Sequence, residues 1–152
     1  MISSIVPRPI GWLTTLPFEL STEEGGEKKL PDYSKTNLAP FSFFNAVSGQ
    51  PPYVMVSIAS RDGIHKKDTL RNIEDSGEFV VNVVDADLTE LCNLSAKEFP
   101  ADVSEPEKLG IELVPSVDVR PPRVKLSKVS MECKVFQITP LPDSEYTMVI
   151  GN

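Results

Sequence analysis

Residues 36–48 (TNLAPFSFFNAVS) constrain the fold most, because they combine large apolar side chains with small polar ones in an extended pattern. In a β-strand, successive side chains point to opposite faces. Each face of this stretch would carry both kinds of residue, so neither face would be purely core or purely solvent. Pro40 has no backbone N–H for a ladder, which predicts that the strand lies at an edge, at a bulge or beside a ligand. One face would hold Leu38, Pro40, Ser42 and Phe44, and the other Asn37, Ala39, Phe41, Phe43 and Asn45.

The composition is that of one folded domain. The chain has 152 residues, of which 40% are hydrophobic and 24% charged, a balance typical of globular proteins. With 22 acidic and 15 basic residues its net charge is −7, which disfavours nucleic acid or an anionic membrane as the main partner. No apolar run approaches the roughly 18 residues of a membrane span, and the N-terminus lacks a signal-peptide pattern. We therefore expect a cytoplasmic protein.

The only histidine and the two cysteines predict little chemistry. Cys92 and Cys133 are far apart and form no Cys-x-x-Cys motif, so we expect buried thiols rather than a disulfide or a zinc site. A catalytic triad or a histidine metal site would have to use His65 alone, and a surface or supporting role fits it better.

The remaining pattern predicts short strands and two or more short helices. Residues 68–75 have Leu70 and Ile73 at helical spacing before Gly77, and a second helix opens at residues 87–90 with capping-box spacing. Residues 17–35 are polar and predict an exposed loop, as do residues 98–107. Strands are predicted over residues 5–15, 53–59, 78–84, 109–114, 117–119, 124–138 and from 147. Trp12 is expected in or beside the core. Six or seven strands with short helices indicate a mainly β, antiparallel barrel with helices filling its ends.

Residues 66–69 could bind a phosphate group. Two lysines, Asp68 and Thr69 stand at the predicted start of a helix, where free N–H groups and the helix dipole favour an anion. The spacing alone favours another interpretation, in which Lys66 and Lys67 are solvated and Asp68 or Thr69 only caps the helix.

Residues 37–48 (NLAPFSFFNAVS) resemble the signature strand of the flavin reductase-like, FMN-binding split-barrel family. Further segments agree in order along nearly the whole chain, namely VPRPIGW (6–12), KDTLRNI (67–73), GEFVVN (77–82) and RPPR (120–123). The resemblance implies one six- to seven-stranded antiparallel split barrel over residues 1–152, truncated at one or both ends, with residues 17–35 as an insertion where the family has a tight hairpin.

The resemblance also implies the site. Residues 67–69 match the phosphate-contacting motif of the family. An isoalloxazine ring needs a flat apolar slot with backbone and small polar partners, and residues 37–42 offer that mixture. From the residues alone, a structural strand with polar ends is an equal alternative. The expected FMN contacts are Asn37, Leu38, Ala39, Pro40, Phe41, Ser42, Ser57, Ser60, Arg61, Lys67, Asp68 and Thr69.

The function that follows is a flavin reductase or flavin-dependent oxidoreductase, working as a homodimer. NADH or NADPH would be a transient co-substrate, since no glycine-rich nucleotide loop occurs. The cofactor would carry the hydride chemistry, with no obligatory side-chain acid. Two alternatives are an electron-transfer flavoprotein that serves a protein acceptor, as flavoredoxin-like members do, and a structural barrel that has lost flavin. RPPR (120–123) could meet the partner subunit.

Overall fold

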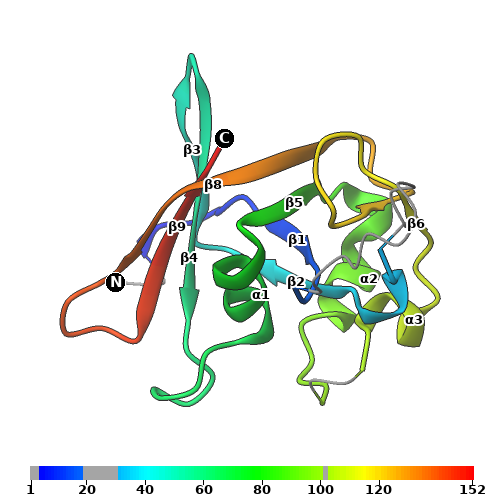
Figure 1. The fold of residues 1–152 in the computed structure, drawn as a ribbon, viewed down its shortest axis with the longest axis horizontal. Coiled ribbons are helices and arrows are strands. Elements are labelled where there is room, and N and C mark those ends of the chain that lie inside the picture. The colour runs from blue at the N-terminus through cyan, green and yellow to red at the C-terminus, as the bar shows by residue number, and fades with distance from the viewer. Residues whose placement is uncertain (1–3, 19–30, 101–102) are drawn as a thin grey trace, which may run out of the picture.

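A curled, seven-stranded antiparallel sheet dominates the structure, a computed structural model that describes residues 4–18, 31–100 and 103–152 (Figure 1). Its strand order is β2-β1-β5-β8-β9-β4-β3, and a two-stranded sheet pairs β6 with β7. The strands are β1 (Gly11–Thr15), β2 (Asn37–Phe41), β3 (Phe44–Gly49), β4 (Pro52–Ala59), β5 (Glu78–Val83), β6 (Leu113–Val114), β7 (Arg123–Val124), β8 (Ser130–Pro140) and β9 (Tyr146–Gly151). The predicted mainly β, antiparallel architecture is confirmed.

The predicted single strand over residues 36–48 is two strands, and this expectation was wrong. The chain bends at Ser42 and Phe43, so that β2 pairs with β1 and β3 pairs with β4. The bend is stabilised from both sides, because the Arg8 Nε donates to the Ser42 Oγ at 3.2 Å and the Ser57 N–H donates to the Phe43 carbonyl at 2.8 Å. The strands β2 and β3 are the two edges of the sheet. Pro40 predicted an edge, a bulge or a position beside a ligand, and the first of these is confirmed.

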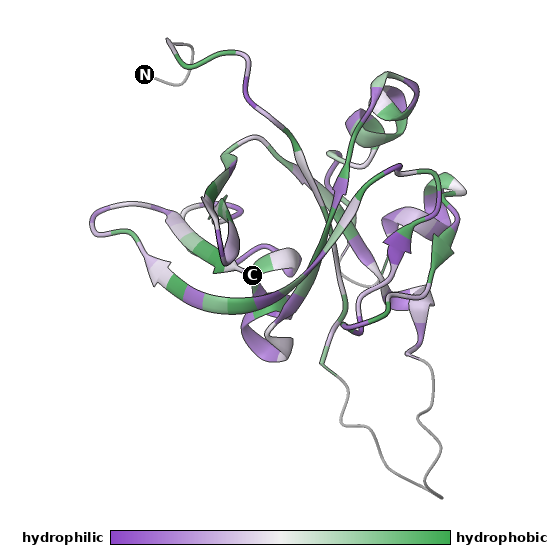
Figure 2. Ribbon diagram, turned by 90° about the horizontal axis from the view of Figure 1, so that it is seen from above, coloured by the Kyte–Doolittle hydropathy of each residue, from purple (hydrophilic) through white to green (hydrophobic). Residues whose placement is uncertain are grey.

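Two apolar clusters fill the two sides of the β1–β2 end of the sheet. The cluster inside the curl contains Phe41 together with Leu70 and Ile73 of α1, and Ala39 packs against it. The other cluster contains Leu38 and the fully buried Trp12. The sides of β2 thus alternate as expected, and both are packed. Polar and apolar residues also alternate along residues 130–135 of β8 (Figure 2).

The helices occupy two places. The helix α1 (Asp68–Ser76) lies inside the curl, whereas α2 (Thr89–Leu94) and α3 (Glu105–Leu109) each contact β2 from outside the curl (Figure 1). Gly77 ends α1 with a left-handed φ of 70°, as predicted. Short 3-10 turns cover Tyr33–Lys35 and Ala86–Leu88. Within the described ranges, no helix is long and apolar enough to cross a membrane.

Several predicted element boundaries need correction. The second helix is capped by Asp85 through a 3-10 turn, and α2 begins only at Thr89, so the expected capping box at residues 87–90 does not form. The predicted loop over residues 98–107 contains the start of α3, where Pro106 is compatible with a first helical turn. Residues 101–102, and residues 19–30 of the predicted insertion, lie outside the described residues.

Strand predictions near the end of the chain were too long. Residues 117–119 form no strand, because the Glu132 carboxylate accepts the N–H groups of Val117 and Asp118 in place of a ladder. In the predicted strand over residues 109–114, only Leu113–Val114 is extended. The strand β8 begins at Ser130, and Val129, which lies within the predicted strand over residues 124–138, is 54% exposed.

Candidate functional site

The start of α1 carries an ion-pair cluster. The Arg61 Nη2 lies 3.0 Å from the Asp68 Oδ2, and Arg71 donates to the other oxygen of the same carboxylate. An acidic residue in the first turn of a helix is favourable. With both oxygens accepting from guanidinium groups, Asp68 orients the two arginines and offers no donor to an anion. Arg71 was not among the predicted residues, although it follows Asp68 by three positions, a spacing that places both on one side of a helix.

The two lysines before α1 differ in their partners. The Lys66 Nζ lies 2.8 and 2.7 Å from the two carboxylate oxygens of Glu74. The Lys67 Nζ lies 5.8 Å from the centre of the Phe41 ring and, in the part of the chain that the structure describes, has no carboxylate partner. The interpretation of a solvated surface lysine therefore fits Lys66, whereas Lys67 retains an ammonium group that could bind an anion. Lys67 itself is the N-cap residue of α1, without a side-chain cap.

A buried polar network joins β2 to α1. The Asn37 Nδ2 donates to the Thr69 Oγ1 at 2.8 Å and to the Thr15 Oγ1 at 3.3 Å. The Asn72 Nδ2 donates to the same Thr15 oxygen at 3.1 Å. Thr69 is 1% exposed. Asn37 and Thr69 thus tie the predicted ring-binding strand to the predicted phosphate-binding helix.

The outer edge of β2 is covered by α3. The Leu38 N–H donates to the Glu105 Oε2 at 2.9 Å, and the Ser104 Oγ donates to the Thr36 carbonyl at 2.8 Å. Leu38 is fully buried, so its side chain and its N–H are both engaged within the subunit. Glu105 is 8% exposed, and burial raises the pKa of its carboxyl. Sequence reasoning missed this contact, although Ser-Glu-Pro at 104–106 is a helix-start signal.

An open groove of about 550 Å³ lies on the opposite side of β2 from the ion-pair cluster. Pro40 faces this groove on the same side of the strand as Leu38, and Arg8 lies on its wall. Its lining is mostly apolar, and its charged and polar residues are Arg8, Asp85, Thr89 and Asn93. The size is that of a small-molecule site. Ser42 borders the same region through its hydrogen bond to Arg8.

The two predicted serines of β4 differ in environment. Ser57 is half-buried and alternates with the core residues Val56 and Ile58, so it faces away from the inner cluster. The Ser60 Oγ is buried and has no hydrogen-bond partner among the described residues. A buried hydroxyl without a partner is unusual in folded proteins, and a bound polar ligand would satisfy it.

The predicted site is therefore partly assembled. Direct contacts link Asn37 to Thr69, Phe41 to Lys67 and Arg61 to Asp68, with residues 67–69 as the common segment. Pro40 lines the groove on the other side of β2, and Ser42 is linked to that groove through its hydrogen bond with Arg8. No hydrogen bond or ion pair within the described ranges joins Ser57 or Ser60 to either group.

The single histidine and the two cysteines make local contacts or are buried. The His65 Nδ1 lies 2.7 Å from the Asp62 Oδ2, and bonds from the His65 backbone and side chain lower the pKa of Asp62 to about 2. Both groups lie in an exposed turn. Cys92 and Cys133 are buried free thiols, as predicted, and desolvation raises the pKa of Cys92 to about 11 and that of Cys133 to about 12.

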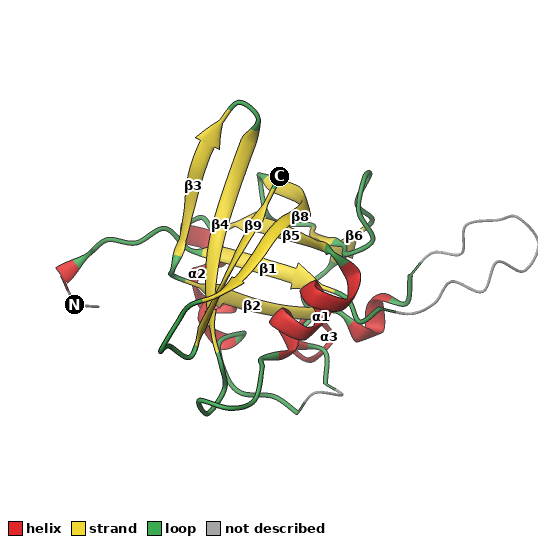
Figure 3. Cartoon of the chain, turned by 60° about the vertical axis from the view of Figure 1, so that its left-hand side comes forward, coloured by secondary structure: helices red, strands yellow, loops and turns green. Residues whose placement is uncertain are grey.

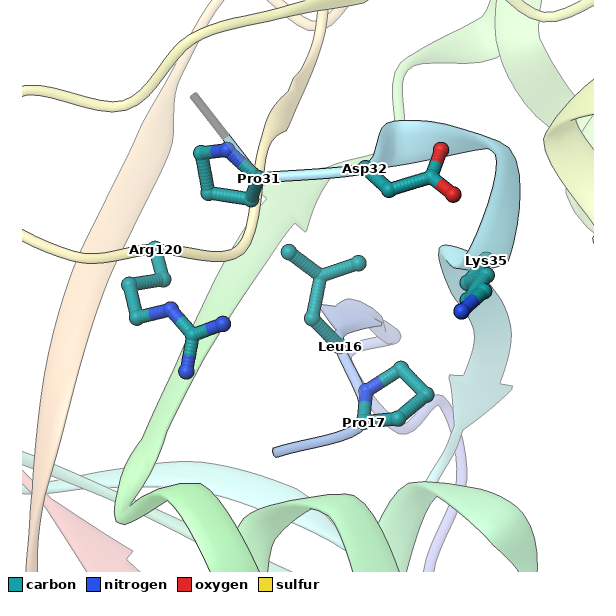
Figure 4. A pocket seen from close by; sticks show the side chains of 6 residues that line it. All are labelled: Leu16, Pro17, Pro31, Asp32, Lys35 and Arg120. Carbon is teal, nitrogen blue, oxygen red and sulfur yellow. The ribbon is translucent and has the colours of Figure 1, made fainter. Parts of the chain in front are cut away.

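A second cavity is too small for a cofactor. It measures about 10 Å³, the space of a single water molecule. Figure 4 shows its lining residues, with Arg120 at the left, Lys35 at the right and Leu16 between them. Arg120 is half-buried there, and the two prolines that follow it in RPPR (120–123) are buried within this subunit.

The whole described fold matches one class of protein, the flavin reductase like class. The model of the flavin reductase like domain matches residues 3–152, and the chain belongs to that family. An uncharacterized protein of Aquifex aeolicus is 40% identical over 143 residues, which are 94% of this chain and 66% of that protein. The chain spans between about half and two thirds of the length of the curated relatives it matches.

Solved structures agree with this family. Nitrilotriacetate monooxygenase component B from Bacillus cereus is 31% identical with a TM-score of 0.80, over 98% of this chain and 68% of that one. A split-barrel-domain protein from Shewanella frigidimarina has a TM-score of 0.77 at 21% identity, over 95% of this chain and 63% of that one, which supports the fold. The expected split barrel is confirmed.

Proposed function

We propose that the chain is an FMN-dependent oxidoreductase domain that accepts hydride from NADH or NADPH. The observation that carries this proposal is Lys67, a cation without a carboxylate partner among the described residues, at the N-terminus of a nine-residue helix. A phosphate monoester suits that position, because helix N–H groups and an ammonium favour a dianion. Membership of the flavin reductase like family and the likeness to a monooxygenase component support a redox role.

The residues present fit FMN. Bound FMN would supply the hydride acceptor, so the protein needs to bind and orient it rather than provide an acid or base. Lys67 and Arg61 would hold the phosphate, with Asp68 orienting Arg61 across 3.0 Å. The buried Ser60 hydroxyl lacks a partner in the described part of the chain, and a ribityl or phosphate oxygen would satisfy it.

The ring would lie along β2. Asn37, Ala39, Pro40 and Ser42 are half-buried and leave surface to a ligand. The Asn37–Thr69 bond fixes the strand relative to the phosphate end. The Leu38 N–H is held by Glu105, so Leu38 would contribute through its carbonyl and by supporting the strand. The groove beside Pro40 and Ser42 would admit part of the ligand or its transient co-substrate.

Comparing FMN with riboflavin tests which end of the site supplies selectivity. In Lys67→Ala, FMN binding should weaken by roughly 1.5–3 kcal/mol, less whatever solvent screening removes, while riboflavin binding barely changes. Ser42→Ala should weaken both ligands alike. Isothermal titration measures both affinities. Lys66→Ala is the matched control, since Lys66 is already paired with Glu74 and its loss should cost little for either ligand.

Two outcomes of this titration contradict the proposal. Equal losses for FMN and riboflavin in Lys67→Ala would place the phosphate elsewhere. A wild-type protein that binds no flavin would leave only the structural-barrel alternative.

Anaerobic mixing separates a reductase from an electron-transfer protein. FMN-loaded protein should lose its flavin absorbance on mixing with NADH or NADPH. If neither nucleotide bleaches the flavin at a rate compatible with turnover, electron transfer between protein partners becomes the better proposal.

A homodimer is part of the same proposal. The outer side of β4 carries Met55 and Ser57, and the neighbouring ring pair Tyr53 and Phe136 has centroids 5.0 Å apart, with Phe136 63% exposed. A specific dimer would cover roughly 1,200–2,000 Å² in total. Light scattering on the FMN-loaded protein should give twice the chain mass, and a monomer mass would contradict the assembly.

A further inference from the structure

We propose that Glu105 is a positioning residue for the flavin ring, because its carboxylate fixes the outer edge of the strand that would bind that ring. This inference rests on the proposed function and adds a residue that neither the sequence motifs nor the family resemblance assigned. Glu105 would touch the strand and not the ligand.

The contact replaces a missing strand. Since β2 is an edge of the sheet, its outward N–H and C=O groups have no ladder partner. Two consecutive outward positions are nevertheless paired, because Glu105 accepts the Leu38 N–H at 2.9 Å and Ser104 donates to the Thr36 carbonyl at 2.8 Å. The next outward position is Pro40, which has no N–H to pair. The segment that begins α3 therefore holds the Thr36 carbonyl and the Leu38 N–H on the outer edge of this stretch.

Burying a carboxylate at this position costs desolvation energy, which a specific interaction has to offset. Glu105 is 8% exposed, and a buried charge is tolerated only with good partners. The charges of the ion-pair cluster also act on the Glu105 carboxyl, because Asp68 opposes its ionisation and Arg61 favours it. A charge-assisted bond to a backbone N–H is stronger and more directional than a neutral one, which is what fixing one strand against a ligand requires.

Two links therefore hold β2 from opposite sides. On the inner side Asn37 bonds to Thr69 of α1, and on the outer side Leu38 bonds to Glu105 of α3. With the outer link removed, the strand keeps its β1 pairing but its outward N–H is unpaired and free to shift toward water or ligand. The ring would then meet a strand of variable position, and both FMN and riboflavin would bind less well.

The experiment compares Glu105→Ala and Glu105→Gln with Glu107→Ala, an exposed carboxylate on the same helix. Hydrogen exchange of the Leu38 amide in flavin-free protein reports the link itself. Titration with riboflavin and FMN reports the ring position, and the absorbance band of bound flavin reports its surroundings. We expect Glu105→Ala to lose Leu38 protection and to raise the Kd of both flavins by roughly 10-fold, the size of effect of one unpaired buried donor.

Glu105→Gln should restore much of the affinity, because its side-chain carbonyl can still accept the Leu38 N–H. Glu107→Ala should match wild type in every measurement. If Glu105→Ala does not fold, Glu105→Gln and Ser104→Ala carry the test through amide exchange and flavin titration.

Unchanged flavin affinity in Glu105→Ala, or a Leu38 amide that stays protected, would overturn the role. A loss confined to FMN would also overturn it, since that result would mean that Glu105 acts through Arg61 on the phosphate. If wild type binds neither flavin, the proposed function itself fails, an outcome distinct from a variant that behaves like wild type.

Discussion

The strands β2 and β3 are the two edges of one sheet, come from one continuous stretch of sequence, and are treated in opposite ways. The outer edge of β2 is covered by α3 through Ser104 and Glu105, and both of its sides are packed. In β3, every residue after the half-buried Phe44 is exposed. It projects with β4 beyond the rest of the sheet (Figure 3).

The bare strand has its own protection against edge-to-edge pairing. The register between β3 and β4 shifts between Ala46 and Ser48, which makes Val47 a bulge. Bulges twist an edge and interrupt a template for further strands. One edge is therefore made rigid by added contacts, and the other is left accessible but irregular. This difference suits a cofactor-binding strand on one side and an accessible surface on the other.

The largest expected effect contrasts one residue from each edge. Leu38→Ala truncates a fully buried side chain in the cluster around Trp12. It should cost about 2–5 kcal/mol of unfolding free energy. Val47→Ala, at a position that is 52% exposed, should stay within about 0.5 kcal/mol of wild type. Urea denaturation measures both. Similar losses in the two variants would show that β3 is buried in solution by an interface.

A smaller effect is expected at the bend that separates the strands. A Cβ on Gly11 would lie 2.9 Å from ring atoms of Phe44, so Gly11→Ala should displace the start of β3 and cost about 1–3 kcal/mol by overpacking. Thermal unfolding gives the loss. Gly49→Ala is the control, because nothing lies within 4 Å of its added Cβ. A Gly11→Ala protein as stable as wild type would show that the Phe44 ring can move without penalty.

The sequence predicted the elements better than their arrangement. Hydrophobic alternation and Pro40 identify an edge strand because these signals are local. The bend at Ser42 and Phe43 depends on Gly11 and on Ser57, which are distant in sequence, so an alternating pattern could not reveal it. The start of α1 could be predicted from residues 66–69. That Lys66 is paired with Glu74 while Lys67 has no carboxylate partner in the described chain, and that Glu105 reaches Leu38, follows only from the fold.

The smallest expected effect is a pH dependence that belongs to the covered edge alone. Burial raises the pKa of Glu105 above its usual 4.5, with Asp68 adding to the rise and Arg61 opposing it. The folded protein therefore holds this proton more tightly than the unfolded chain. The contribution of Glu105 to stability is complete below pH 4.5 and declines as the pH rises toward the folded pKa, above which it is constant.

The slope for one proton cannot exceed about 1.4 kcal/mol per pH unit. Urea denaturation across this range measures the unfolding free energies of wild type and Glu105→Gln. The advantage of wild type over Glu105→Gln should become smaller as the pH rises. Glu107→Gln should show no such trend, since Glu107 is exposed. A difference that grows with pH would mean that the Leu38 N–H and Arg61 stabilise the carboxylate more than burial penalises it, and the covered edge would then be held by a fully ionised contact from acid pH upward.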